Sequence, residues 1–588
     1  MITRRALLLQ TVAPIGPRRA IRLELEGRDA IELKFDGGKP LEAGPLRLWL
    51  AGEHAVEIYA KEPAVFNLEW AFEIPRDSEF YSWRKRETER VALVQDTGEP
   101  GKRGIPSQLF PFAGAVRNGE LFGVLGECPG FWENRSQQTI DPAGGVIALR
   151  TGDGSARRAM TGIWGDSSDF YRGEYDGWQH IRKAESRKYE VWTFRAPVRD
   201  GLYSVRLASH RALARAKGWN NSTLEAILRN NAYLQIRRNL LREESRYIFT
   251  SGVTYGWKEW ASDAAMAGLG LGDPEILAEA MRGLFWDRLS YEDNAQWYLI
   301  VSAVFARRGY RPNMALCRRC WEFLKDHESG GAFLPPRLNG PNAGLGWRTY
   351  MDLFYYEDGD APTSNQGFHC GATMAARELG LGVAETEITK AGQAYAAMFN
   401  SREGYFPTSA RRQEVFGGDA MYGVAVTFAA FGRKCLPDEL VRRHCAHAMR
   451  IQSKYGLRVV SKANGDLLEQ NQYGPGNPHG LPPEKAGAYV QGGSWFFCDA
   501  GTWLAGLAHG MDPRLVDRLL TERIKIELAN APAFSESINT RTGEPHGNLL
   551  YAANALYLWL RREIRERLHQ TGPDPVARAV DQWLVQKY

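Results

Sequence analysis

Alternating apolar and polar positions dominate the first third of the chain. Between residues 21 and 197, segments such as IRLELEG, AIELKFDG, LRLWLAG, HAVEIYAK and KYEVWTF alternate or are rich in β-formers, with Gly and Asp at their ends. Period-two alternation is typical of strands that bury one face. Many short strands of this kind predict an antiparallel β-sandwich over residues 17–200.

After residue 200 the spacing of apolar positions becomes helical. Residues 201–248, rich in Ala, Leu and Arg, are predicted to be a helical linker, and residues 249–588 contain twelve predicted helices in six hairpins. The first helix of most pairs is nearly uncharged, as in DAMYGVAVTFAAFG, and the second is charged on one face, as in DELVRRHCAHAMRIQSKYG. Because helices that are apolar all round are buried and amphipathic ones lie outside, the pattern predicts an (α/α)6 toroid.

Composition and charge exclude several classes of protein. The 588 residues are 44% hydrophobic and 24% charged, which is an ordinary globular balance. The net charge is only +5 and the basic residues are scattered along the chain, so no nucleic-acid partner is expected. No apolar run is long enough to cross a membrane. Arg4 and Arg5 before a short apolar run resemble a twin-arginine signal, which predicts export through residues 1–16 to the periplasm or beyond. A simple first strand in a cytoplasmic protein is the alternative.

No motif indicates a metal or an organic cofactor. Cys317 and Cys320 form a CxxC inside a predicted helix, without a second CxxC or a His cluster, so the seven cysteines are expected to be buried or unpaired thiols. P-loop, dinucleotide-binding, HExxH and Ser/His/Asp signatures are missing from the sequence. We therefore expect chemistry that uses side chains alone.

Acidic residues among aromatic ones mark a first catalytic candidate between residues 331 and 362. Asp352 follows an apolar stretch next to Tyr and Phe residues. A carboxyl group in such surroundings is desolvated, which raises its pKa and suits it to donate a proton. Glu357 and Asp358 remain alternatives, whereas a solvated acidic turn explains Asp358 and Asp360 in EDGD equally well.

A second candidate lies in FSESINTRTGEPHGN. Glu536 stands between Ser535 and Ser537, just before a turn formed by Asn, Thr and Gly. Among polar neighbours this carboxylate should stay ionised and could activate a water molecule. Glu544 is instead predicted to be a first-turn helix acid before Pro545.

Five predicted loop segments place Trp or Tyr beside amides and acids. Functional side chains concentrate on loops, and sugars bind aromatic faces together with planar polar groups. These segments and their neighbours supply the candidates for substrate binding, which are Trp257, Glu259, Trp260, Asp293, Trp297, Trp347, Arg348, Tyr350, Gln366, His369, Gln491, Trp495 and His546.

Two stretches resemble known six-hairpin glycosidases. The stretch that carries the general acid in the amylo-α-1,6-glucosidase part of glycogen-debranching enzymes is similar to RTYMDLFYYEDGDAPTSNQGFHCGATMAARELG. The stretch that carries the general base in glycoside hydrolase family 63 resembles FSESINTRTGEPHGNLLYAANALYLWL. The resemblance implies Asp352 as general acid and Glu536 as general base. Tyr350 stands where Trp is usual and Ile538 where an aromatic residue is usual, and the family 63 Asp-Asn/Asp-Ser-Pro-Arg stretch is missing.

The expected activity is hydrolysis of an oligo- or polysaccharide by an inverting, exo-acting glycosidase that degrades carbohydrate. Inversion requires the two carboxyl groups to lie roughly 6.5–9.5 Å apart. A phosphorylase that uses Arg541, His479 and His546, a polysaccharide lyase that uses Tyr473 and His479, and a non-catalytic carbohydrate-binding protein are the alternatives. The sequence does not specify the sugar, the linkage or the oligomeric state.

Overall fold

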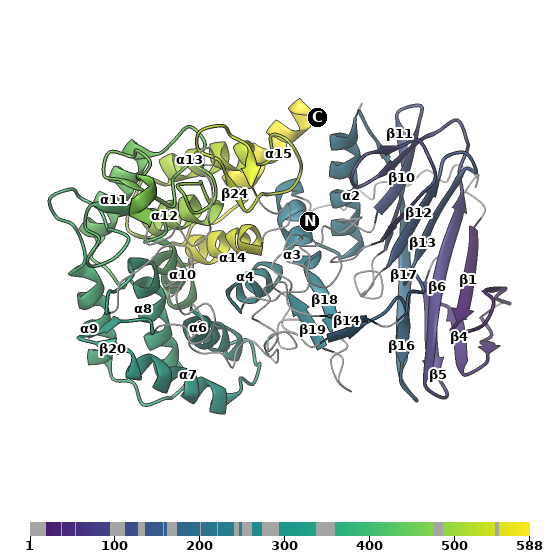
Figure 1. Cartoon of the computed structure of the whole chain (residues 1–588), viewed down its shortest axis with the longest axis horizontal. Helices are drawn as coiled ribbons and strands as arrows, with labels where there is room; N and C mark the ends of the chain where they lie inside the picture. The colour runs from purple at the N-terminus through teal and green to yellow at the C-terminus, as the bar shows by residue number, and fades with distance from the viewer. Residues whose placement is uncertain are drawn as a thin grey trace, which may run out of the picture.

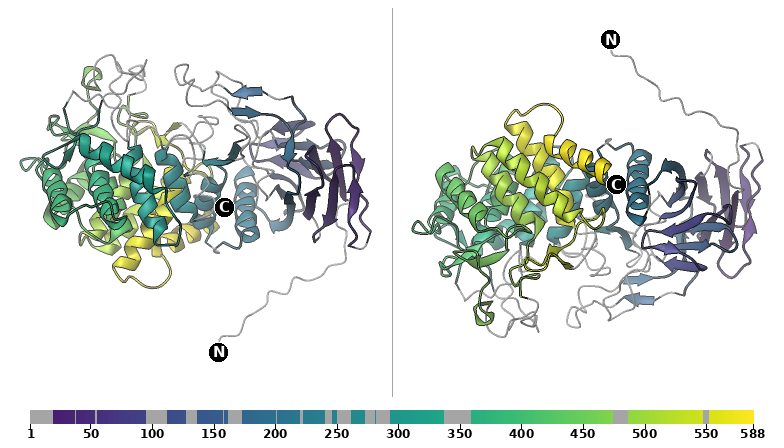
Figure 2. Two further views of the ribbon diagram at one scale, coloured as in Figure 1. Left: turned by 90° about the horizontal axis from the view of Figure 1, so that it is seen from below. Right: turned by 90° about the horizontal axis from the view of Figure 1, so that it is seen from above.

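The computed structural model describes residues 19–36, 38–52, 55–94, 112–126, 136–156, 158–160, 173–199, 201–219, 222–239, 246–249, 261–272, 281, 293–336, 359–473, 486–546 and 552–588. Antiparallel sheets occupy one end of the molecule and helices the other (Figure 1). Helix α2 lies between the two parts, and the carboxyl-terminal end of the chain lies next to it (Figures 1 and 2). This proximity brings the rings of Tyr203 and Tyr588 into a parallel stack with centroids 3.5 Å apart.

Two antiparallel sheets pack face to face over the first 200 residues. The first has the order β2-β1-β6-β13-β12-β9, with β16 also paired to β6, and the second has the order β3-β4-β5-β17-β11-β10-β7-β8. The strands of the first sheet are β1 (Arg19–Leu25), β2 (Ile31–Glu32), β6 (Ala64–Glu73), β9 (Val91–Val94), β12 (Gln137–Asp141), β13 (Val146–Arg150) and β16 (Gln179–Ile181). Those of the second are β3 (Leu41–Ala43), β4 (Leu46–Leu50), β5 (Ala55–Ala60), β7 (Glu79–Ser82), β8 (Arg86–Glu87), β10 (Phe112–Arg117), β11 (Glu120–Gly126) and β17 (Ser186–Pro197).

The predicted alternation is the reason why these sheets pack. Along β6, every second side chain from Phe66 to Phe72 is at most 1% exposed. Phe66 meets Tyr189 of β17 edge-on at 5.8 Å, and Phe72 meets Phe122 of β11 at 6.1 Å, so the two inner faces share one apolar layer. Two short hairpins lie outside these sheets, β14 (Arg158–Met160) with β15 (Gly173–Tyr175), before β16, and β18 (Ile236–Asn239) with β19 (Arg246–Phe249), after α3.

Thirteen α-helices follow the sheets in the described part of the chain. They are α2 (Leu202–Ala216), α3 (Thr223–Tyr233), α4 (Ala261–Leu271), α6 (Asn294–Ala306), α7 (Met314–Asp326), α8 (Thr363–Glu378), α9 (Glu385–Ala396), α10 (Tyr422–Phe431), α11 (Asp438–Ile451), α12 (Phe496–Ala508), α13 (Pro513–Glu527), α14 (Ala552–Arg567) and α15 (Pro575–Lys587). The helix predicted over residues 273–288 lies outside the described residues, apart from Met281.

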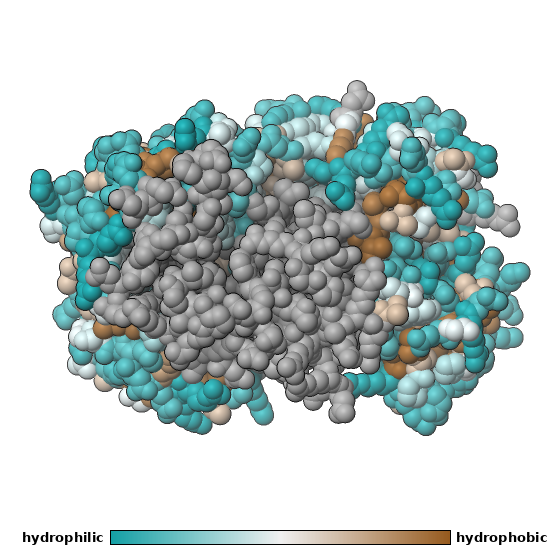
Figure 3. All heavy atoms as spheres, in the orientation of Figure 1, coloured by the Kyte–Doolittle hydropathy of each residue, from teal (hydrophilic) through white to brown (hydrophobic). Residues whose placement is uncertain are grey.

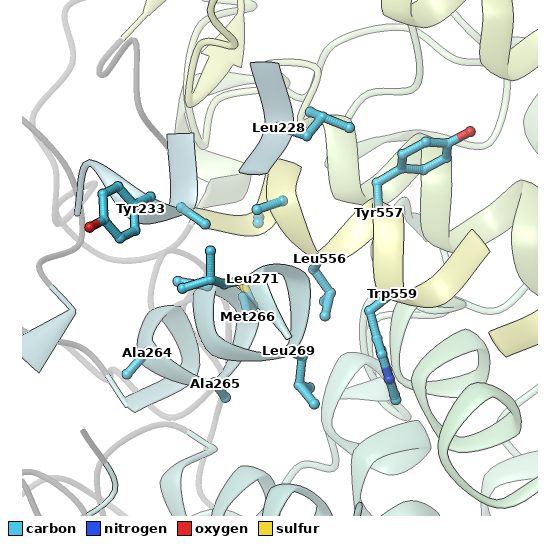
Figure 4. Packing of buried hydrophobic residues seen from close by; sticks show 14 of the residues in the cluster. Leu228, Tyr233, Ala264, Ala265, Met266, Leu269, Leu271, Leu556, Tyr557 and Trp559 are labelled. Atoms are coloured by element: carbon cyan, nitrogen blue, oxygen red, sulfur yellow. The ribbon is translucent and has the colours of Figure 1, made fainter. Parts of the chain in front are cut away.

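The helices differ in burial as their sequences predict. Nearly every residue of α6, α8, α10 and α12 is buried, whereas α7, α9, α11 and α13 bury one face. Helices α4, α6, α8, α10, α12 and α14 contact one another in that order, and α14 packs again on α4. Figure 4 shows this last contact, where Met266 and Leu269 of α4 face Leu556 of α14. On the surface of the helical part, hydrophilic side chains cover most of the coloured area in Figure 3.

The cysteines that the structure describes are free. Cys317 and Cys320 are free and fully buried on α7, so this CxxC is part of the helix packing. Within the described ranges, no group of three or more metal-ligating side chains comes together. Of the helices that the structure describes, none has both the length and the apolar character to cross a bilayer.

Candidate functional site

Backbone pairing links the segments that precede helices α8, α10, α12 and α14. Moving from α8 toward α14, Thr363 pairs with Thr408, β22 (Val415–Gly417) with β23 (Val460–Lys462), and β24 (Ser537–Ile538) with β25 (Pro545–His546). Isolated bridges join Pro407 to Phe416 and Ser494 to both Arg458 and Ile538. We call these segments the rim belt, comprising residues 360–363, 407–419, 458–462, 493–495 and 535–546. The belt places the side chains around it at the amino-terminal ends of α8, α10, α12 and α14.

Glu536 lies in this belt with its backbone held on both sides. Ser535 donates from its amide and its hydroxyl to one oxygen of Glu527, at 3.3 and 2.9 Å, and its carbonyl accepts from Asn554 at 3.4 Å. Two residues after Glu536, Ile538 exchanges two backbone hydrogen bonds of 2.9 Å with Ser494. Glu536 is only 4% exposed. Its position is therefore determined by the surrounding helices rather than by the loop itself.

A buried ionic network connects these two anchors. Arg523 of α13 pairs with Asp499 of α12 at 2.8 Å and with Glu527 at 2.9 Å, and none of the three side chains is more than 1% exposed. Asp499 also accepts from the amide of Leu457 at 2.9 Å and from the hydroxyl of Ser494 at 3.2 Å. Burial raises the pKa of Asp499, against the opposite effect of Arg523. Burial alone would lower the pKa of Arg523, but Glu527 and Asp499 raise it, so the guanidinium stays charged.

The segment before Glu536 is docked on α2. The Tyr203 hydroxyl donates to the carbonyl of Leu528 at 2.7 Å, and the His210 ring lies 2.9 Å from the carbonyl of Pro532. Burial lowers the pKa of His210 to about 3, so the ring is neutral and uses Nε2–H as the donor to Pro532. The ring also meets Trp83, which follows β7, edge-on at 5.0 Å. The sheets thus support the helix that holds the Glu536 segment.

Asp419 is a second buried carboxyl group of the rim belt, immediately before α10. Burial raises its pKa to about 7, while its own amide and the Ser364 hydroxyl lower it by less. In the described part of the chain, no Lys, Arg or His side chain forms an ion pair with it. With a pKa of about 7, about half of this carboxyl group is protonated at neutral pH, and the protonated form can donate a proton or a hydrogen bond.

Close contact between α8 and α10 creates this environment. A Cβ atom on Gly423 would lie 2.5 Å from the Phe368 amide nitrogen, and one on Gly367 would lie 2.7 Å from Gly423. The two glycines therefore let the helix backbones touch, which brings Ser364, near the start of α8, to Asp419. The motif GGDAMYG, an acid between glycines and an apolar helix, is the signal that could have identified Asp419.

An arc of aromatic rings runs along the same ends of the helices. Consecutive rings lie 4.9–5.6 Å apart, from Trp297 on α6 to His546 on β25. The members of this aromatic arc, in order, are Trp297, Phe368, Tyr422, Phe497, Trp495, Tyr489 and His546. Three predicted binding residues, Trp297, Trp495 and His546, thus belong to one continuous series of ring contacts. Tyr489 completes it and was not predicted.

The remaining predicted residues fall into three groups. Gln491 is buried in the turn next to Trp495, and Asp293 is buried at the start of α6. Gln366 and His369 instead serve the packing of the 328–333 segment, because the Gln366 amide bonds both backbone groups of Phe333 and His369 lies 3.5 Å from Glu328. Outside the described residues lie Trp257, Glu259, Trp260, Trp347, Arg348, Tyr350, Asp352, Glu357, Asp358 and His479.

Two acidic turn residues differ from expectation. Asp360 accepts from the amides of Ala361 and Arg411 and from the Ser409 hydroxyl, so it does form a turn, but it is 4% exposed rather than solvated. Glu544 is exposed in the turn between β24 and β25. The prediction of a first-turn helix acid at Glu544 was wrong, because the chain forms a hairpin there.

No protein-family model and no curated protein sequence matches the chain. Among solved structures, it is similar to an uncharacterized conserved protein from Thermus thermophilus, at 11% identity and a TM-score of 0.39 over 57% of this chain and 100% of that one. A GH63 mannosylglycerate hydrolase from the same organism, in complex with Tris and D-glycerate, gives 12% identity and a TM-score of 0.38 over 57% and 100%. Its complex with glucose gives the same identity and TM-score over 54% and 95%.

Proposed function

We propose that this protein is an inverting, exo-acting glycoside hydrolase, with Asp352 as general acid and Glu536 as general base. The observation that carries the proposal is the position of Glu536, a buried carboxylate whose two flanks are anchored by one ionic network, in a belt that also holds Trp495 and His546. Hydrolysis of a glycosidic bond uses a pair of carboxyl groups held at a fixed separation, and aromatic rings offer apolar faces on which a sugar can pack.

The proposed architecture is an (α/α)6 toroid. The closed order of contacts from α4 to α14 and back to α4 supports this, with the less buried helices outside. Exo-action is proposed because several segments converge on the rim around Glu536, which favours a chain end over a long, continuous chain.

In the proposed mechanism, the Glu536 carboxylate takes a proton from a water molecule as the water attacks the anomeric carbon. Asp352 protonates the departing glycosidic oxygen from the opposite face, and inversion follows from this arrangement. Asp419 is a second candidate for the proton donor, because it is buried in the rim belt and burial raises its pKa to about 7, so a large fraction of it carries a proton near neutral pH.

The lyase alternative is less well supported. Tyr473, its expected base, is 2% exposed, and burial raises its pKa to about 12. A tyrosine base needs a lowered pKa to remove a proton at neutral pH. The phosphorylase alternative retains His546 in the aromatic arc as a candidate phosphate contact.

The test uses the purified full chain with α- and β-linked disaccharides of glucose, mannose and galactose. Proton NMR of the first product should show the inverted anomer, without dependence on phosphate and without an unsaturated sugar. Glu536→Gln should abolish turnover of disaccharides and of the matching glycosyl fluoride. A variant that lacks the general acid should keep activity only on the glycosyl fluoride, because fluoride leaves without protonation. Comparison of Asp352→Asn with Asp419→Asn therefore identifies which carboxyl group is the acid. Retention of configuration, or full activity of Glu536→Gln, would contradict the proposal.

A further inference from the structure

We propose that the ring of Tyr489 is a stacking platform for a pyranose ring of the substrate, next to the general base. This inference rests on the proposed function, since it requires a carbohydrate ligand. It is carried by the backbone of Tyr489, by the contacts of its turn and by the position of its ring.

Tyr489 has a left-handed backbone conformation, with φ at 45°. The same turn, residues 487–493, contains two other left-handed positions, and both are glycine, Gly487 at φ 90° and Gly492 at φ 87°. A bulky side chain in this region costs conformational free energy that glycine avoids. A tyrosine at position 489 therefore indicates that its side chain has a use.

The turn itself does not need that side chain. It is closed by backbone hydrogen bonds of 2.8 Å from Gly487 to Gln491 and from Gly493 to Tyr489. It is tied to the Glu536 hairpin by Thr540, whose hydroxyl donates to Gly492 at 2.8 Å. The Tyr489 carbonyl also accepts from the Trp495 indole at 3.2 Å. A glycine at position 489 could make each of these main-chain contacts.

The Tyr489 ring lies between Trp495 and His546 in the aromatic arc. Its centroid is 5.0 Å from Trp495 and 4.9 Å from His546. Trp495 is 2% exposed, whereas Tyr489 is only half-buried, so of these two rings the tyrosine is the more accessible to a ligand. His546 pairs with Ser537, the residue after Glu536. A sugar on this ring would therefore lie beside the segment that carries the proposed base.

A packing role is the alternative, in which the ring only covers Trp495. Tyr489→Gly and Tyr489→Ala distinguish the two roles, because both remove the ring but only glycine relieves the left-handed backbone. His569→Gly is the matched control, since His569 is another left-handed residue at φ 55°, exposed beyond the far end of α14.

The experiment measures KM, kcat and melting temperature for the disaccharide that the wild type cleaves fastest. We expect KM to rise about tenfold in both Tyr489→Gly and Tyr489→Ala, as loss of an aromatic contact predicts, and to stay within about twofold in Tyr489→Phe. The melting temperature of Tyr489→Gly should equal or exceed that of the wild type and exceed that of Tyr489→Ala. His569→Gly should leave KM unchanged.

An unchanged KM in both ring-deletion variants, with a lower melting temperature, would overturn the inference while the proposed function stands. Failure of the wild type to cleave or bind any saccharide of the panel would instead overturn both. The two failures are thus separated by the behaviour of the wild type.

Discussion

Glu527 accepts two hydrogen bonds from Ser535, one from the amide at 3.3 Å and one from the hydroxyl at 2.9 Å. Ser535 directly precedes Glu536, so a carboxylate at the end of α13 positions the backbone of the proposed base. Arg523 holds Glu527 and reaches the Ser494 side of the hairpin through Asp499. One buried guanidinium therefore organises both flanks of Glu536.

Ser535→Ala removes the hydroxyl bond and keeps the amide bond. We expect the free energy of unfolding to fall by about 1 kcal/mol, and kcat to fall while KM is unchanged, because the base shifts but the binding surface does not. Glu527→Ala should cost about 3–5 kcal/mol, since it leaves Arg523 partly uncompensated in the interior. Glu527→Gln, which keeps an acceptor for Ser535, should retain more of kcat than Glu527→Ala. Denaturant unfolding and steady-state kinetics test this, and a wild-type kcat in Ser535→Ala would contradict it.

Asp419 should make stability depend on pH. Burial raises its pKa from 3.8 to about 7 in the folded protein. Between these values Asp419 is ionised in the unfolded chain and protonated in the folded one, so its contribution to stability is greatest below about pH 4 and falls by about 1.4 kcal/mol per pH unit up to about pH 7. Above that pH the loss is complete.

The side chain at position 419 cannot ionise in Asp419→Asn, so the unfolding free energy of this variant should lack the decrease with pH that Asp419 causes. The stability of the variant relative to the wild type should therefore increase between pH 4 and pH 8. The neighbouring Cys498 and Tyr395 do not interfere, because burial raises the pKa of each further above its ordinary value. The buried histidines act in the opposite direction, but they are common to both proteins and cancel in the difference. Parallel stability curves for the two proteins would contradict the assignment.

Much of the fold could be predicted because each element shows its burial in its sequence. The alternation in β6 and the uncharged, buried helices are examples. Glu536, Trp495 and His546, predicted as site residues, lie together in the rim belt, and their roles stay predictions. Asp419 could not be predicted, because its raised pKa comes from contact between two helices that no local pattern pairs. Arg523 was missed for a related reason. On an amphipathic helix its sequence position indicates a solvated charge, yet its side chain is only 1% exposed.

His210 should matter for activity although it lies away from the rim belt. His210→Ala removes the donor to Pro532, which should cost roughly 2 kcal/mol of stability and lower kcat about tenfold by loosening the Glu536 segment. His509→Ala is the matched control, because His509 is also buried, with its pKa lowered to about 4, but lies at the other end of α12. It should lose similar stability and keep kcat. Equal kcat values in the two variants would contradict a positioning role for His210.

Gly423→Ala should disrupt the contact on which Asp419 depends. The new methyl group would lie 2.7 Å from the backbone of Gly367, and neither helix backbone can move aside cheaply, so we expect a loss of about 3 kcal/mol or more. Separation of the helices would admit water to Asp419 and lower its pKa toward the ordinary value. Gly506→Ala is the control, since its methyl group meets the flexible sulfur of Met511 and alanine favours the helix by about 0.5–1 kcal/mol. Denaturant unfolding of both variants at pH 5 and pH 8 tests this, and equal stability of the two would contradict it.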